Sequence, residues 1–283
     1  MPPHIGAVPL LNNIRVTDMH PMLNMAVKAA RNAGNIIMRH ADRLERLTVE
    51  TKGLKDYVSE VDRMAENEII RVLRAAYPDH GFLGEESGAQ AGNDFVWIID
   101  PLDGTTNFLH GFPHFGVSIA LKYKDRLDQA VVFDPSRNEL FTASRGGGAQ
   151  LNDRRIRVSR VTELEYALLG AGFPFRAHDH MDAWIGTLKE FMLNTSGIRR
   201  PGSASLDLAY VACGRYEGFW EIGLSPWDMA AGALLVQEAG GLVTDFAGDH
   251  GYLESGNILA GNPKIYAEML RRIQPHLTED LRR

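Results

Sequence analysis

The sequence predicts a mixed α/β fold with α+β character, arranged as one compact domain. Its 283 residues, 45% hydrophobic and 23% charged, have the composition of a globular protein. Two helical patterns and a series of short strands fill the first half, whereas strands and helices alternate in the second. No repeat or low-complexity linker separates the halves. We therefore expect a single domain at 19–283, with subdomains at about 19–160 and 161–283.

Residues 1–18 show no clean periodicity, and we interpret them as an N-terminal extension. No stretch reaches the roughly 18 apolar residues of a membrane span, and the first residues lack the basic region of a signal peptide. Cys213 is the only cysteine, so an internal disulfide is excluded. These observations predict a cytoplasmic protein with no membrane partner.

Two amphipathic helices open the first half. Apolar residues recur at helical spacing at Leu23, Ala26, Val27, Ala30, Ala33 and Ile37, and again at Ala65, Ile69 and Leu73. Tyr77-Pro78 ends the second helix. Short strand patterns follow at 82–83, 95–99, 117–123, 130–133 and 140–142, of which the last two form a hairpin. A glycine turn follows at 146–148.

Strands and helices alternate after about residue 161. The expected strands lie at 166–171, near 198, and at 219–222, 242–246 and 258–260. The expected helices lie at 181–193, 204–214, 228–239 and from about 264.

The charges are unevenly distributed around a net charge of −6, which argues against a surface built mainly for nucleic acid. The 47 residues from Ala75 to Leu121 contain six acids, and the 48 from Tyr216 to Pro263 contain seven, but neither segment contains a Lys or Arg. Both segments also hold most of the apolar strands. Carboxylates buried there need a counter-charge from elsewhere, and a metal cation is the simplest source.

The clearest chemical signal is Trp97-Ile98-Ile99-Asp100-Pro101-Leu102-Asp103-Gly104-Thr105-Thr106-Asn107-Phe108. An apolar strand ends at Asp100, Pro101 interrupts the ladder, and Asp103 begins what resembles a capped helix. Carboxylates at such a corner are hard ligands for Mg²⁺, and the N–H groups after Asp103 offer a phosphate site. The alternative is a structural turn in which Asp103 is only an N-cap.

An Asp-Gly-Thr string also occurs in phosphatases of the haloacid-dehalogenase type, where an Asp nucleophile lies two residues before the second Asp. Here the spacing is three. Residues i and i+2 of a strand share a face and residues i and i+3 do not. The corner therefore suits two carboxylates flanking a metal pair better than a nucleophile and an acid, although the covalent mechanism is not excluded.

Other acids have both a functional and a structural interpretation. Glu85 follows a short strand and could supply another oxygen to the same cation, or belong to a solvated turn. Asp62 completes a Ser59-x-x-Asp62 capping box, which is a structural role. Asp228 begins a helix of small residues, where it could be an N-cap. Arg199-Arg200 precedes another helix and could steady an anionic substrate or be solvated.

Three motifs together resemble the signatures of the inositol monophosphatase superfamily. They are Gly84-Glu85-Glu86-Ser87, Trp97-x-x-Asp100-Pro101-Leu102-Asp103-Gly104-Thr105-Thr106-Asn107-Phe108 and Trp227-Asp228-x-Ala230-Ala231-Gly232. Asp134-Pro135-x-Arg137-Asn138 and Gly172-Phe173-Pro174-Phe175 resemble a bacterial branch of it. The resemblance runs from about Met19 to the C-terminus and implies a layered α-β-α-β-α sandwich of the sugar-phosphatase type.

The resemblance also implies a site with two to three Mg²⁺ ions. Glu85, Asp100 and the Leu102 carbonyl would hold one ion, and Asp100, Asp103 and Asp228 a second. Thr105 and Asp62 would orient and deprotonate the attacking water, and Glu85 would assist them. The implied substrate-binding residues are Glu85, Leu102, Asp103, Gly104, Thr105, Arg199, Ala204, Glu221 and Asp228. Phosphate would rest on Gly104 and Thr105, and the alcohol part near Ala204 and Glu221.

The implied activity is Mg²⁺-dependent, Li⁺-sensitive hydrolysis of myo-inositol monophosphate to inositol and phosphate by direct water attack, in a homodimer. Other members of the superfamily act on fructose 1,6-bisphosphate, histidinol phosphate, phosphoadenosine phosphate or NADP, so the substrate stays open. Proteins of the bacterial branch also act as non-catalytic partners in ribosomal RNA transcription antitermination, contacting NusA and RNA polymerase. The arginines that could form such a surface are Arg154, Arg155, Arg157, Arg160, Arg199 and Arg200.

Overall fold

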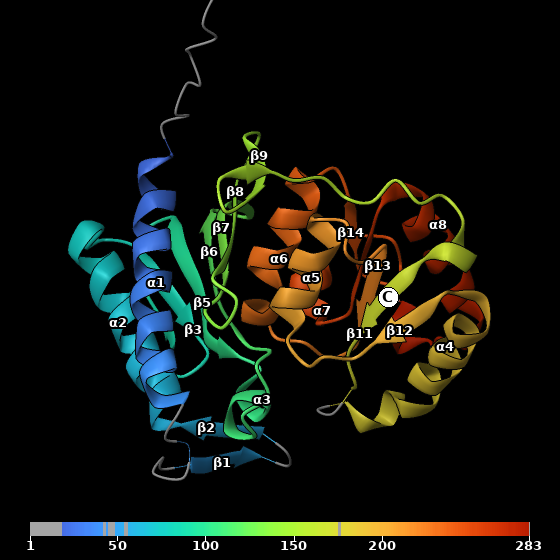
Figure 1. Ribbon diagram of the computed structural model, residues 1–283, viewed down its shortest axis with the longest axis horizontal. Helices are drawn as coiled ribbons and strands as arrows, with labels where there is room; N and C mark the ends of the chain where they lie inside the picture. Colours follow the sequence, from blue (N-terminus) through green and yellow to red (C-terminus); the bar gives the residue numbers. More distant parts are fainter. Residues whose placement is uncertain (1–18, 42–43, 45–48, 54–55, 175–176, 283) are drawn as a thin grey trace, which may run out of the picture.

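The computed structural model describes residues 19–41, 44, 49–53, 56–174 and 177–282 (Figure 1). In this part of the chain, helices and sheets alternate in layers, as the sequence and the family resemblance predict. Helices α1 (Pro21–Ala41) and α2 (Glu60–Ala76) cover one face of an eight-stranded sheet. The predicted extension 1–18 lies outside the described residues.

The eight-stranded sheet has the strand order β10-β9-β8-β7-β6-β5-β3-β4. Its strands are β3 (Gly81–Gly84), β4 (Gly88–Gln90), β5 (Phe95–Asp103), β6 (Gly116–Tyr123), β7 (Arg126–Asp134), β8 (Glu139–Ser144), β9 (Gly148–Leu151) and β10 (Arg154–Arg155). Only β3 and β5 pair in parallel; the other neighbours are antiparallel. The predicted hairpin between 130–133 and 140–142 is formed by β7 and β8.

The second sheet has five strands in the order β12-β11-β13-β15-β14. They are β11 (Leu168–Ala171), β12 (Gly197–Arg199), β13 (Gly218–Glu221), β14 (Leu242–Thr244) and β15 (Ile258–Gly261). Helices α4 (Met181–Asn194) and α8 (Pro263–Ile273) pack on its outer face. Helices α5 (Ala204–Ala212) and α6 (Pro226–Glu238) lie between the two sheets. Because α6 is covered on both sides, it is apolar around most of its circumference.

Local signals explain how α2 is bounded. The Ser59 hydroxyl accepts the Val61 N–H at 3.2 Å, and the Asp62 carboxylate accepts the Ser59 N–H at 2.9 Å. This arrangement confirms the predicted capping box. The helix ends before Tyr77-Pro78, as predicted. Its buried residues include Ala65, Ile69 and Leu73, which follow the predicted apolar spacing.

Several boundaries differ from the sequence prediction. The strand expected at 166–171 is divided into a 3₁₀ turn (Leu164–Tyr166) and β11. Helix α6 begins two residues earlier than expected, because Pro226 is well suited to a first helical position. The short elements β1 (Val49–Gly53), β2 (Asp56–Ser59), β4 and α7 (Tyr252–Ser255) were not predicted.

A boundary between subdomains at about residue 160 stays a prediction. The eight-stranded sheet ends at Arg155 and the five-stranded sheet begins at Leu168, but α5 and α6 contact both sheets. Among the described residues, none of the helices combines the length and apolar character of a membrane span.

Candidate active site

The end of β5 is irregular and carries two of the predicted acids. The pairing with β6 is regular up to Asp100, opposite Ser118, and resumes at Asp103, opposite Gly116. Pro101 and Leu102 form the irregular step, which suits a residue that has no N–H to donate to a ladder. The step allows Asp100 and Asp103 to face the same cavity although they are three residues apart.

This cavity has a volume of about 510 Å³ and brings together residues that are far apart in the sequence. The predicted site residues that line it are Glu85, Asp100, Leu102, Asp103, Gly104, Thr105, Ala204, Glu221 and Asp228. Of the predicted residues, only Asp62 and Arg199 are not part of the lining. The structure therefore gathers most of the predicted site at one place.

Asp62 lies directly behind Thr105. The Thr105 hydroxyl is 3.0 Å from Asp62 Oδ1 and 3.0 Å from the Leu102 carbonyl oxygen, so it can donate to either. The second carboxylate oxygen of Asp62 accepts hydrogen bonds from the Ser59 N–H and hydroxyl, at 2.9 and 2.6 Å. Burial raises the pKa of Asp62, and the hydrogen bonds from Ser59 and Thr105 oppose that rise.

Asp103 joins the first sheet to the start of α5. Its Oδ2 accepts hydrogen bonds from the Ser203 hydroxyl at 2.6 Å and from the Ser205 N–H and hydroxyl at 2.7 and 2.6 Å. The helix start that the sequence predicted at 103–106 is confirmed, but the prediction that Asp103 caps it is wrong. Helix α3 (Thr105–Leu109) has Gly104 as its N-cap, without a side-chain cap, because the Asp103 carboxylate is used by α5 instead.

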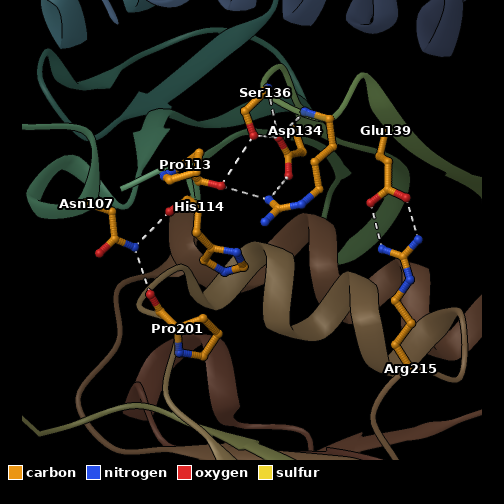
Figure 2. A network of polar contacts seen from close by, with 9 residues as sticks. Asn107, Pro113, His114, Asp134, Ser136, Glu139, Pro201 and Arg215 are labelled. Carbon is orange, nitrogen blue, oxygen red and sulfur yellow. Dashed lines mark hydrogen bonds and ion pairs between the residues drawn. The ribbon is translucent and has the colours of Figure 1, made fainter. Parts of the chain in front are cut away.

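Gly104 has a backbone conformation that favours glycine, with φ of +94°. A Cβ atom there would also lie 3.0 Å from the His114 carbonyl oxygen. The Asn107 side-chain amide donates to the carbonyls of His114 and Pro201, both at 2.8 Å, as Figure 2 shows. Asn107 thus ties α3 to the loop that precedes α5.

Further polar contacts hold the turn between β7 and β8 (Figure 2). Asp134 accepts hydrogen bonds from Ser136 and from the Arg137 side chain, and Arg137 also donates to the Pro113 carbonyl at 2.9 Å. Glu139 and Arg215 form a two-point ion pair that links β8 to the segment after α5. Of these contacts, the Glu139–Arg215 pair joins the large sheet to the segment after α5.

The carboxylates of the cavity repel one another. The pKa of Asp100 is raised well above its usual value, first by burial and then by the charges of Glu85, Asp103 and Asp228. Burial also raises the pKa of Asp103, although hydrogen bonds from two serines oppose the rise. The site therefore stabilises positive charge that enters it.

For Asp228, the N-cap interpretation is wrong, because the N-cap of α6 is Ser225. It is the third residue of α6, where its Oδ2 accepts the Ser225 N–H at 2.8 Å in a capping arrangement. It also lines the cavity. A structural contact and a candidate functional position coincide in one side chain.

Sequence reasoning missed Asp207, a further acid of the cavity lining. It is almost fully buried, and its Oδ1 has no hydrogen-bond partner within the described residues. Burial raises its pKa well above the usual value, the charges of Glu221 and Asp103 add to the rise, and Arg200 opposes it. Its place in the Gly202–Asp207 helix start was the only signal in the sequence.

The arginine at the cavity is Arg200, whereas Arg199 was predicted. Arg199 is the last residue of β12, is exposed, and donates to the neighbouring Ile198 carbonyl at 3.1 Å. Since successive residues of an extended chain point to opposite sides, only one of the pair can face the cavity. Arg200 lies outside the two segments without Lys or Arg, and its positive charge opposes the rise in the pKa of Asp207.

A second part of the cavity lining, the apolar wall, was also not predicted. Its residues are Phe173, His178, Met181, Trp184 and Ile185. The rings of Phe173 and Trp184 meet edge to face, with centroids 4.8 Å apart. The Arg200 guanidinium lies 4.4 Å from the centroid of the Phe173 ring. The glycine and aromatic motif at 172–175 was the available signal.

Glu85, Asp100, Leu102, Asp103 and Asp228 form what we call the acid wall of the cavity. Its donors are carboxylate oxygens and the Leu102 carbonyl, which are the donor types that a hard divalent cation prefers. The mutual repulsion around Asp100 is the kind that such a cation relieves. Within the described part of the chain, no three His, Cys, Asp or Glu side chains already form a ligating group. The residues fit a divalent cation by the type of their donor atoms and by their shared cavity.

The chain is a layered α/β protein with helices between and outside its two large sheets (Figure 1). Its candidate active site is the carboxylate-lined cavity. Residues 18–279 match the model of the inositol monophosphatase family, and the chain belongs to that family. This confirms the resemblance found in the sequence.

Relatives of the chain carry two kinds of name. "Nus factor SuhB" of Pseudomonas aeruginosa is 59% identical over 271 residues, which are 94% of this chain and 100% of the relative. A crystal structure of "extragenic suppressor protein suhB" from Bartonella henselae has a TM-score of 0.89 and 46% identity, covering 91% of this chain and 100% of that one. An inositol monophosphatase from Anabaena has a TM-score of 0.81 and 37% identity, covering 90% and 95%.

Proposed function

We propose that this protein is a Mg²⁺-dependent phosphomonoesterase that hydrolyses myo-inositol monophosphate to inositol and phosphate by direct attack of water. One observation carries the proposal: Glu85, Asp100, Asp103 and Asp228 line a single cavity beside the Asp62 and Thr105 pair. Membership of the inositol monophosphatase family and the likeness to an inositol monophosphatase structure support it.

Two to three Mg²⁺ ions would be held by the acid wall. Glu85, Asp100 and the Leu102 carbonyl would hold one, and Asp100, Asp103 and Asp228 a second. Bound there, Mg²⁺ would polarise the phosphoryl group and make a coordinated water more acidic. The carboxylates keep this end of the cavity negative, and so favour cations over anions until the cations are in place.

The chain's own groups would position the water and the phosphate. Thr105 would orient the attacking water and Asp62 would take its proton, because the pKa of Asp62 is raised and its carboxylate is therefore a better base. Glu85 would assist this pair. The N–H groups of Gly104 and Thr105 begin a helix and lack intrahelical acceptors, so they suit a phosphate oxygen.

The alcohol part of the substrate would lie towards Ala204 and Glu221. Arg200 now takes the substrate-side role first assigned to Arg199, because Arg200 lines the cavity. These residues would determine which substrate the site accepts. The candidates are inositol monophosphate and the other substrates of the superfamily, such as fructose 1,6-bisphosphate, histidinol phosphate, phosphoadenosine phosphate and NADP.

The test is phosphate release by the purified protein from each of these substrates, with Mg²⁺ and after its removal by a chelator. We expect release from myo-inositol monophosphate that requires Mg²⁺ and is inhibited by millimolar Li⁺. A protein that releases no phosphate from any monoester in saturating Mg²⁺ contradicts the proposal. A homodimer and a cytoplasmic location are parts of the same proposal.

A second, non-catalytic role is suggested by the relatives named Nus factor SuhB. As a partner in ribosomal RNA transcription antitermination, the chain would contact NusA and RNA polymerase. Four exposed arginines after β9 offer a basic surface: Arg154, Arg155, Arg157 and Arg160. Rescue of a null strain by an Asp103→Asn variant would support this role, and failure of that variant would support a catalytic one.

A further inference from the structure

Glu66 is a buried acid with no part in the proposed mechanism. It lies on α2 with only 2% of its surface exposed. Its Oε2 accepts the Glu86 N–H at 2.9 Å, and its Oε1 accepts the Ser87 N–H at 2.8 Å. Each carboxylate oxygen is thus bound to a backbone donor of the turn that begins with Glu85.

Gly84 provides the space for this carboxylate. A Cβ atom at Gly84 would lie 2.5 Å from Glu66 Oε2, which is closer than real Cβ contacts. On its other side the turn is tied to β5, because the Glu85 N–H donates to the Ile99 carbonyl at 3.1 Å. The backbone around Glu85 is therefore fixed both by β5 and by α2.

The same helix also supports the proposed base. Asp62 and Glu66 are four residues apart, so they lie one turn apart on one face of α2. Asp62 reaches Thr105, and Glu66 reaches the turn that carries Glu85. A displacement of α2 would move both sides of the acid wall together.

We propose that Glu66 is a positioning residue whose carboxylate, by holding the Glu86 and Ser87 N–H groups, places Glu85 opposite Asp100 and so raises the cation affinity of the cavity. The inference rests on the proposed function, since it assigns Glu85 to a cation. Partners that orient metal ligands typically contribute about 10- to 100-fold to metal affinity or activity.

The chain contains a matched control outside the cavity. The Glu238 carboxylate accepts the N–H groups of Gly146 and Gly148, both at 2.8 Å, in the same two-point arrangement. It holds the turn between β8 and β9. Replacing Glu238 removes a similar pair of hydrogen bonds without touching the turn at Glu85.

The experiment is Mn²⁺ binding, followed by electron paramagnetic resonance, to wild type, Glu66→Gln and Glu238→Gln. The glutamine amide replaces one acceptor by a donor, so it faces one of the two N–H groups unfavourably. We expect Glu66→Gln to bind Mn²⁺ about tenfold or more weakly, with most of kcat recovered at saturating metal. Glu238→Gln should keep wild-type affinity even where its thermal stability falls.

A second variant tests the contact between Glu66 and the turn without changing any acid. Gly84→Ala should push the Glu66 carboxylate away and weaken Mn²⁺ binding, and its effect should nearly disappear in the Glu66→Gln background. Unchanged affinity in Glu66→Gln, or fully additive effects, overturns the inference while leaving the proposed function intact. A wild-type protein that binds no Mn²⁺ overturns the proposed function and the inference together.

Discussion

The two walls of the cavity are held in different ways. Asp103 on the acid wall, and Asp62 behind Thr105, are buried and accept hydrogen bonds from helix starts. On the apolar wall, Phe173 and Ile185 remain 42% and 50% exposed, and Phe173 is held by contacts to another ring and to Arg200. Directional contacts fix atoms closely, whereas apolar and cation-π contacts tolerate small shifts.

In the proposed function, this difference between the walls separates the chemistry from the choice of substrate. The proposed proton transfer and cation binding need closely placed atoms, and the acid wall holds its side chains by directional contacts. The apolar wall can change its side chains without disturbing those atoms. Substitutions on the acid wall should therefore lower kcat, and those on the apolar wall should change mainly KM.

The largest effect is expected for Asp103→Asn. The change removes a charge from the proposed cation site and alters the hydrogen bonds from Ser203 and Ser205. We expect phosphate release to fall by at least about 100-fold. The control is Asp245→Asn, because Asp245 is also buried and accepts the Ala247 and Asp249 N–H groups, but does not line the cavity. Equal losses in both variants would contradict a special role of the acid wall.

Thr105→Val should lower kcat by about 100-fold, with Thr105→Ser keeping most of the activity. The pH profile gives a second readout. Since Asp62 must be ionised to accept a proton, the rate should fall as the pH drops through its raised pKa. Loss of the Thr105 hydrogen bond raises that pKa further, so the acid limb of Thr105→Val should move to higher pH. If the acid limb of the pH profile is the same in Thr105→Val and wild type, Asp62 is not the base.

Asp207 lines the cavity and is almost fully buried, and its replacement tests the cost of that burial. Its raised pKa means that the folded protein keeps a proton that the unfolded chain loses above about pH 4. Stability therefore falls as the pH rises from there to the folded pKa. Asp207→Asn removes this loss and should stabilise the protein by about 1 kcal/mol or more at pH 7, with no gain below about pH 4. Denaturant unfolding at several pH values measures the difference, and a less stable variant at pH 7 would refute the account.

The smallest effect is expected on the apolar wall. Phe173→Ala removes the ring beneath Arg200 and should raise KM by about two- to fivefold, with kcat nearly unchanged. Met192→Ala, on an exposed part of α4, serves as the control. A large fall in kcat for Phe173→Ala would show that the two walls are not separate in function.

Many of the elements that hold the acid wall could be predicted because their sequence signals are local. The apolar spacing of α1 and α2 and the capping box at Ser59 lie within a few residues of one another. The strand end at Asp100 and the break at Pro101 are equally local. Single acids were ambiguous, and only their combined order, which matches the family, predicted a shared cavity.

The rest depends on contacts between distant segments. Asp103 finds its partners at Ser203 and Ser205, about a hundred residues away, so its local appearance as an N-cap was misleading. The choice between Arg199 and Arg200 depends on where β12 ends. Asp207 looked like an ordinary helix residue, because its burial follows from the packing of α5 between two sheets.

The central claim is that acids distant in the sequence hold divalent cations in one cavity. Its most direct test is an anomalous difference map from crystals of the wild-type protein soaked in Mn²⁺. The account predicts peaks bound by Glu85, Asp100, Asp103 and Asp228. A cavity without a peak, in crystals of a protein that hydrolyses its substrate with the same Mn²⁺, would contradict it.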